Sequence, residues 1–200
     1  RRRELLEQIG ISFEVRVSDK EEVYHSLIPE EIVKELALSK AENVADDLRE
    51  KQEQVKQISF DKKNNVLLDT IVIGADTIVV SDGSILGKPK DEADAVRMIR
   101  SLQGRSHKVY TGVAILDYDD EGKRKSVVHA VETEVFVNPM SDEEIREYAA
   151  TGEPLDKAGA YGIQGRFAAY IERIDGDYYN VVGLPVSYVY RQLKEIAEKD

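Results

Sequence analysis

A carboxylate inside an apolar run is the strongest candidate for chemistry in this sequence. Residues 69–80 read Asp-Thr-Ile-Val-Ile-Gly-Ala-Asp-Thr-Ile-Val-Val, and their β-branched side chains predict a buried strand that Asp76 and Thr77 interrupt. A buried carboxylate is costly unless a cation, a metal ion or water meets it. Asp76 is therefore either satisfied inside the fold, as the cap of a neighbouring turn, or open to a cleft.

Cations at three other places could meet an anionic ligand. Three arginines begin a predicted helix over residues 1–10, at the end where the helix dipole and free N–H groups favour anions. Lys88 precedes a proline that restricts its backbone, and Lys157 lies in the segment 152–166, which holds four glycines. Each cation could also be solvated surface. Together with Asp76, however, they suit a metal-bound polyphosphate, whose oxygens need cations and whose metal ion needs carboxylates.

The composition narrows the classes of ligand and chemistry. The chain has 200 residues, 42% of them hydrophobic, which is enough for a core, and a net charge of −11. This charge disfavours general binding to a nucleic acid backbone or an acidic membrane, although a local cluster of cations can still hold one phosphorylated ligand. Cysteine is absent, which excludes disulfides, thiolate metal sites and a cysteine nucleophile. The three histidines lack ligand spacing and are interpreted as surface or strand residues.

Known sequence signals for phosphate binding and for membranes are missing. The sequence contains no Walker A, Rossmann or kinase motif, so a phosphate site would have to be of another kind. No apolar run approaches the roughly 20 residues of a membrane span, and no signal peptide is recognisable. We therefore expect a soluble intracellular protein.

The spacing of apolar residues and turn residues predicts helices and strands that alternate irregularly. Helices are expected over 1–10, from Pro29 into the polar stretch 50–65, from Asp91 to Gly104, from the capping box at Ser141 to Gly152, and after Pro185. Strands are expected over 13–17, 69–80 and 85–89, with hairpins formed by 108–118 with 125–137 and by 168–174 with 178–182. The fold class is thus α/β, or mixed α+β: a bent mixed sheet flanked by helices, with a cleft between two lobes.

Five segments in combination resemble the Maf family of nucleoside triphosphate pyrophosphatases, and most closely its dTTP/UTP pyrophosphatase branch. They are Arg-Arg-Arg-Glu-Leu-Leu at 1–6, Gly-Ala-Asp-Thr at 74–77, Gly-Lys-Pro at 87–89, Tyr-Thr-Gly at 110–112 and Asp-Lys-Ala-Gly-Ala-Tyr-Gly-Ile-Gln-Gly at 156–165. The resemblance covers nearly the whole chain, as one domain over 1–200, with 50–65 as a longer insertion. Family members normally have a first strand and a Ser-x-Ser-Pro segment before the arginines, and this sequence begins after them.

The resemblance implies a fold, a reaction and a set of site residues. The fold is the Maf and inosine triphosphatase (ITPase)-like one, and the reaction splits a nucleoside triphosphate between its α and β phosphates with a divalent cation, Mg²⁺ or Mn²⁺. Asp76 would be the proton acceptor. The other implied roles are substrate specificity for Arg1, Thr77 and Gln164, phosphate binding for Arg2, Lys40, Lys88 and Lys157, and metal binding for Asp76, Glu21, Glu22 and Asp156.

The implied partners are a nucleoside triphosphate and a second copy of the chain, with no nucleic acid polymer and no membrane, in the cytoplasm. Substrates would be dTTP and UTP, with CTP and modified pyrimidine nucleotides as further candidates. One alternative is the branch that acts on 7-methyl-GTP, although residues 160–165 resemble the pyrimidine branch. Another is a regulator of cell division that binds nucleotides without hydrolysing them, but such a site gains nothing from a base at Asp76.

Overall fold

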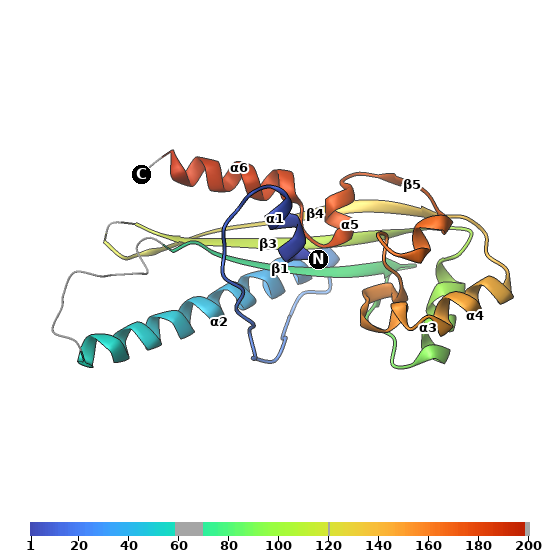
Figure 1. Cartoon of the computed structure of the whole chain (residues 1–200), viewed down its shortest axis with the longest axis horizontal. Helices are drawn as coiled ribbons and strands as arrows, with labels where there is room; N and C mark the ends of the chain where they lie inside the picture. Colours follow the sequence, from blue (N-terminus) through green and yellow to red (C-terminus); the bar gives the residue numbers. More distant parts are fainter. Residues whose placement is uncertain (59–69, 120, 199–200) are drawn as a thin grey trace.

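A five-stranded sheet in the order β2-β1-β3-β4-β5 forms the centre of the structure (Figure 1). It is seen in a computed structural model that describes residues 1–58, 70–119 and 121–198, and of residues 52–58 only the backbone. The strands are β1 (Val72–Ser81), β2 (Ser84–Leu86), β3 (Ser106–Tyr118), β4 (Arg124–Val137) and β5 (Ile171–Asp175). The α/β class and the hairpin of β3 with β4 are confirmed.

All four strand pairings in the described sheet are antiparallel, so the expectation of a mixed sheet is wrong for these residues. The reason lies in the short hairpin of β1 with β2, which reverses the chain before the helix α3 (Glu92–Leu102) carries it across to β3. Strands β2 and β3 therefore run in the same direction, but β1 lies between them and pairs antiparallel with both.

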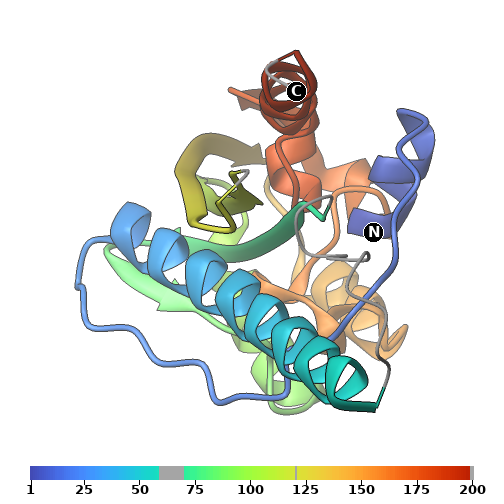
Figure 2. The same ribbon diagram turned by 90° about the vertical axis from the view of Figure 1, so that its left-hand side faces the viewer.

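Helices cover both faces of the sheet (Figures 1 and 2). The long helix α2 (Pro29–Ile58) packs on one face, where Ile32, Val33 and Leu36 meet Ile78, Val80 and Tyr110. The opposite face is covered by α1 (Arg2–Gln8), α5 (Tyr178–Val182) and α6 (Val186–Ala197). At one end of the sheet, α3 packs with α4 (Asp142–Ala150) and with the 3₁₀ helices η1 (Glu153–Asp156) and η2 (Ala158–Ala160), while η3 (Arg166–Tyr170) leads into β5.

Two glycines allow α2 to lie directly on the sheet. A Cβ atom at Gly74 would overlap the carbonyl oxygen of Ala37, and one at Gly112 would overlap the carbonyl oxygen of Val33. Both glycines belong to neighbouring strands, since Gly74 lies on β1 and Gly112 pairs with Asp76 across β1 and β3. The absence of side chains there fixes the distance between the helix and the sheet.

Helix starts agree with the caps that the sequence predicts. The side chain of Asp91 accepts a hydrogen bond from the backbone N–H of Asp94, and Ser141 forms a complete capping box with Glu144. Helix α2 extends to Ile58, which confirms the helical start of the stretch 50–65, and the rest of that stretch from residue 59 lies outside the described residues. Among the described helices, none is both long and apolar enough to cross a membrane.

Two strand predictions are wrong. Residues 13–17 form no strand, and Val15 and Val17 are 62% and 75% exposed, because no strand of the described sheet takes them as a partner. Residues 178–182 form helix α5 instead of the second arm of a hairpin, because the side chain of Asp177 accepts from the N–H of Tyr179 and caps a helix immediately after the turn.

We expect Gly112→Ala to destabilise the protein by about 1–3 kcal/mol, because the added methyl group meets the backbone of α2, which cannot rotate out of the way. Urea unfolding of both proteins measures this change. Gly87→Ala is the matched control: its Cβ would meet nothing within 4 Å, so its free energy of unfolding should stay within about 0.5 kcal/mol of the original. Equal stability of the two variants would contradict the tight packing of α2.

Candidate active site

A cavity of about 900 Å³ lies beside β1 and gathers side chains that are far apart in the sequence. Its wall comes from α1, the loop before α2, α2 itself, β1, β3, the segment 85–88, the glycine-rich turns and the end of α5. Ten of the expected site residues line it: Arg1, Arg2, Glu22, Lys40, Asp76, Thr77, Lys88, Asp156, Lys157 and Gln164. Glu21 does not.

Asp76 forms an ion pair with Lys40 of helix α2. The ammonium of Lys40 lies 2.6 Å from Oδ1 of Asp76 and 2.7 Å from Oε1 of Glu22, and the side chains of Asp76 and Lys40 are only 13% and 26% exposed. Burial by itself lowers the pKa of Lys40, but its hydrogen bonds to both carboxylates outweigh burial, so the net pKa is raised. Lys40 is therefore a fixed cation that orients Asp76 toward the cavity.

The carboxylates of Asp76 and Glu22 are suited to bind a divalent cation, whose remaining ligands would come from the substrate and from water. Asp76 and Glu22 converge on one ammonium group, and Mg²⁺ commonly takes one or two carboxylates together with substrate phosphates and water. No cluster of three or more His, Asp and Glu side chains with metal-binding geometry exists in the described part of the chain. Asp156 pairs with Lys157 and Glu21 does not line the cavity, so metal binding by these two residues stays a prediction.

The expected phosphate-binding lysines differ in their surroundings. Lys88 is exposed on the cavity wall and forms no ion pair with any described residue. The ammonium of Lys157 is bound 2.6 Å from Asp156 Oδ1 and 2.5 Å from the carbonyl oxygen of Glu153. The hydrogen bond and charge of Lys157 hold the pKa of Asp156 below its usual range. Lys88 is thus free for an anion, whereas Lys157 is held in place by the loop that carries it.

The first two arginines reach different parts of the cavity. Arg2 Nε donates to the carbonyl oxygen of Gly183 at 2.8 Å, and its Nη2 donates to Thr77 Oγ1 at 3.2 Å. Arg1 instead extends toward the glycine-rich turns, 3.9 Å from Asp156. Burial lowers the pKa of Arg2, although a guanidinium stays charged at any ordinary pH. The structure thus brings Arg2, and not Arg1, together with Thr77.

A half-buried glutamate that the sequence did not single out braces the glycine-rich turns. Glu153 accepts a hydrogen bond from the hydroxyl of Tyr148 at 2.9 Å and another from the backbone N–H of Arg166 at 3.1 Å. A Cβ atom at Gly165 would overlap its carboxylate. The neighbouring Gln164 is exposed, and its amide makes no hydrogen bond to the described residues. A glutamate at the start of a glycine-rich loop is the signal that could have revealed this brace.

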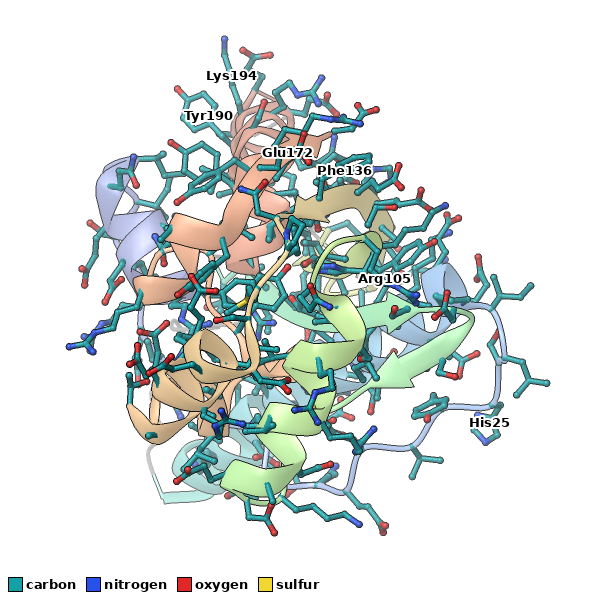
Figure 3. The ribbon with its side chains drawn as sticks, turned by 90° about the vertical axis from the view of Figure 1, so that its right-hand side faces the viewer. His25, Arg105, Phe136, Glu172, Tyr190 and Lys194 are labelled. Carbon is teal, nitrogen blue, oxygen red and sulfur yellow. The ribbon has the colours of Figure 1, made fainter. Side chains whose placement is uncertain are left out.

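His107 supports the same turns from inside the fold. It lies in β3 with 3% of its surface exposed, and its Nε2 is 2.7 Å from the hydroxyl of Tyr161, which lines the cavity. Burial lowers the pKa of His107 to about 4, so the ring is neutral at neutral pH. His25, by contrast, points into solvent on the loop before α2 (Figure 3). Both placements agree with histidines that are strand or surface residues.

Comparison with known proteins gives a consistent result over the whole chain. The family model described as "Maf-like protein" matches residues 1–196. A dTTP/UTP pyrophosphatase of Agathobacter rectalis is 45% identical over 196 residues, which are 98% of this chain and 93% of the relative. Proteins with the same name from Bacillus cytotoxicus and Dictyoglomus turgidum are each 46% identical, over 98% and 93% of this chain and 90% and 86% of their own lengths.

The buried His107 should make stability depend on pH. Its pKa is 6.5 when unfolded and about 4 when folded, so between these values only the unfolded chain binds the proton. The free energy of unfolding should fall as the pH drops from 6.5 to about 4, by about 3 kcal/mol in total, and this contribution is complete above pH 6.5.

Urea unfolding of the original protein and of His107→Gln at pH 7 and pH 5 measures this contribution. Glutamine keeps a hydrogen-bonding group toward Tyr161 but binds no proton, so the variant should lose less stability than the original between the two pH values. Identical losses would contradict a buried neutral histidine.

Proposed function

We propose that this chain, which belongs to the Maf-like family, is a nucleoside triphosphate pyrophosphatase that hydrolyses dTTP and UTP to the monophosphate and pyrophosphate. The observation that carries the proposal is the meeting of Asp76, Lys40 and Glu22 beside free and fixed cations in one cavity. The names of the relatives supply the nucleotides. The cavity volume of about 900 Å³ is at the upper end of the range for small-molecule sites, which suits a nucleotide with its phosphates.

Asp76 is the proton acceptor in this proposal. Water attacks the α phosphorus while its proton passes to the carboxylate, and the bond from that phosphorus to the oxygen bridging the α and β phosphates breaks. The bridging oxygen leaves with the electron pair, as part of pyrophosphate. Lys40 holds Oδ1 of Asp76 by an ion pair, so the carboxylate is oriented before a substrate arrives. The protein forms no covalent bond to the substrate in this reaction, and catalysis comes mainly from positioning the reactants and neutralising the phosphate charge.

The cations of the cavity neutralise the phosphates. Lys88 is exposed and forms no ion pair with a described residue, so its ammonium group can bind the β and γ phosphates, whose negative charge rises as pyrophosphate leaves. Lys157 and Arg1 line the same cavity, near Asp156. A divalent cation held by Asp76 and Glu22 would add further neutralisation of the phosphate oxygens when bound.

Gln164 and Thr77 read the base in this proposal. Uracil and thymine present a carbonyl acceptor at C4 beside an N–H donor at N3, and a primary amide can pair with both. The amide of Gln164 has no hydrogen bond within the described structure, so it is available for this pairing. Thr77 and Arg2 lie on the same cavity wall as Gly183.

Two further expectations stay predictions. We propose a cytoplasmic site of action because nucleoside triphosphates are made and used there, and a homodimer, which sedimentation at several concentrations would detect. The proposed reaction depends on neither the cytoplasmic location nor the homodimer.

We expect Asp76→Asn to lower kcat by about 10²- to 10⁴-fold, because asparagine keeps the shape of the side chain but cannot take a proton. Pyrophosphate release from dTTP, UTP, CTP, GTP and 7-methyl-GTP, each with Mg²⁺ or Mn²⁺, measures the effect. Metal affinity and thermal stability of the variant are measured alongside, since a lost metal ligand would also lower the rate. Normal turnover by the variant would contradict the role of Asp76, and release of phosphate instead of pyrophosphate would contradict the reaction.

We expect Gln164→Ala to lower kcat/KM for UTP and dTTP by roughly tenfold or more, and less for CTP, because the N3 and C4 groups of uracil and thymine lose their partner. Leu155→Ala is a matched surface control in the preceding turn, because Leu155 is 44% exposed and does not line the cavity. An equal loss on all nucleotides in Gln164→Ala would indicate that the glutamine only supports its loop.

A further inference from the structure

A chain of hydrogen bonds runs from the cavity into the core through two threonines. Thr77 and Thr111 face each other across β1 and β3, and their hydroxyl oxygens are 2.8 Å apart. Arg2 Nη2 lies 3.2 Å from Thr77 Oγ1, on the cavity side. On the other side, Thr111 Oγ1 is 2.9 Å from the backbone carbonyl oxygen of Asn180 in α5. Thr111 is fully buried, so no water takes part at its position.

The groups at the two ends of this series of hydrogen bonds determine the direction of each hydrogen bond in it. The carbonyl oxygen of Asn180 can only accept, so the single proton of Thr111 points to it. Thr111 then has no proton left for Thr77, and the hydroxyl of Thr77 must donate to Thr111. The guanidinium of Arg2 can only donate, and Thr77 accepts from it. The opposite direction would place two acceptor oxygens 2.9 Å apart in a buried site, which is unfavourable.

The direction of these hydrogen bonds decides whether the hydroxyl of Thr77 can donate a hydrogen bond to a ligand or only accept one. A hydroxyl has one proton and two lone pairs, and in Thr77 the proton and one lone pair are already used inside the protein. One lone pair remains, and Thr77 lines the cavity. Thr77 therefore meets a ligand as an acceptor only, although a threonine free to rotate could also donate.

We propose that Thr111 is a positioning residue for base selection: by holding the proton of Thr77, it makes the cavity favour pyrimidines with an N3–H donor, uracil and thymine, over cytosine. This inference rests on the proposed function. The N3–H of uracil can be shared by the amide oxygen of Gln164 and the lone pair of Thr77. The N3 atom of cytosine is itself an acceptor, and a lone pair of Thr77 placed against it leaves both atoms unpaired. A site with fixed polar groups rejects an analogue that leaves them unpaired more strongly than it rejects a change of size.

The decisive variant is Thr111→Val, which keeps the shape of the buried side chain and removes its hydroxyl. The hydroxyl of Thr77 then loses its internal acceptor and can turn to donate to N3 of cytosine, while it can still accept from N3–H of uracil. The ratio of kcat/KM for UTP to that for CTP should fall by roughly 3- to 10-fold. Thr111→Ser restores the hydroxyl and should restore the ratio.

Thr133→Val is the matched control. Thr133 is also fully buried and also bonded to the α5 region, through the backbone of Asp177 and the side-chain amide of Asn180, but it makes no hydrogen bond to Thr77. Loss of the Thr133 hydroxyl should disturb α5 as much as loss of the Thr111 hydroxyl does. It should leave the ratio of kcat/KM for UTP to that for CTP unchanged. A purely structural role of Thr111 would change stability and overall rate in both valine variants and the ratio in neither.

Steady-state pyrophosphate release from UTP and CTP, with thermal melting of each variant, gives the answer. An unchanged ratio in a folded Thr111→Val, or an original protein that hydrolyses UTP and CTP equally well, would overturn the inference while leaving the proposed function intact. A protein that releases pyrophosphate from no nucleotide would overturn both.

Gln164→Ala, which lacks the other proposed partner of N3–H, tests the inference if Thr111→Val does not fold. The substrate is 3-methyl-UTP, which lacks the N3–H donor but keeps both carbonyl groups of uracil. The kcat/KM of this variant for 3-methyl-UTP should be at least about tenfold lower than its kcat/KM for UTP, because the acceptor of Thr77 then has no partner. Equally efficient hydrolysis of the two nucleotides by this variant would overturn the inference.

Discussion

The contact between the backbone of α2 and two glycines of the sheet is the constraint on which the cavity depends. Gly74 and Gly112 leave no side chain between the helix and the sheet, so the carbonyl groups of α2 lie directly on β1 and β3. This places Lys40 within 2.6 Å of Asp76. A lysine has a long, flexible side chain, and only a fixed distance between the helix and the strand makes its position, and that of the carboxylate it binds, reproducible.

The alternation of side chains along β1 then divides the work between two neighbouring residues. Asp76 points to the face covered by α2, and Thr77 points to the face where α1 and α5 lie. Both line one cavity. A proton acceptor and a group that reads the base are thus delivered by adjacent positions of a single strand, because successive side chains of a strand point to opposite faces. Neither can shift along the strand without the other.

Charge in the cavity opposes the charge of the whole chain. The protein carries a net charge of −11, yet six cationic side chains line the cavity: Arg1, Arg2, Arg3, Lys40, Lys88 and Lys157. Carboxylates pair with four of them, Arg1, Arg3, Lys40 and Lys157, and so hold these cations in place before a ligand binds. An incoming polyphosphate would meet cations that are already positioned, which lowers the cost of ordering them on binding.

The sequence by itself determined the parts that local chemistry controls: the strand around Asp76, the hairpin of β3 with β4, the caps at Asp91 and Ser141, and the residue types of the site, through apolar spacing, capping side chains and the family resemblance. It could not determine which partners those residues meet. Residues 13–17 have the alternation of a strand but no partner, and residues 178–182 became a helix because Asp177 caps it. The pairing of Arg2 with Thr77 and the direction of the Thr111 proton were decided by the tertiary structure alone. Each depends on atoms that are distant in the chain or on the sole proton of a buried hydroxyl, and local sequence patterns carry no information about either.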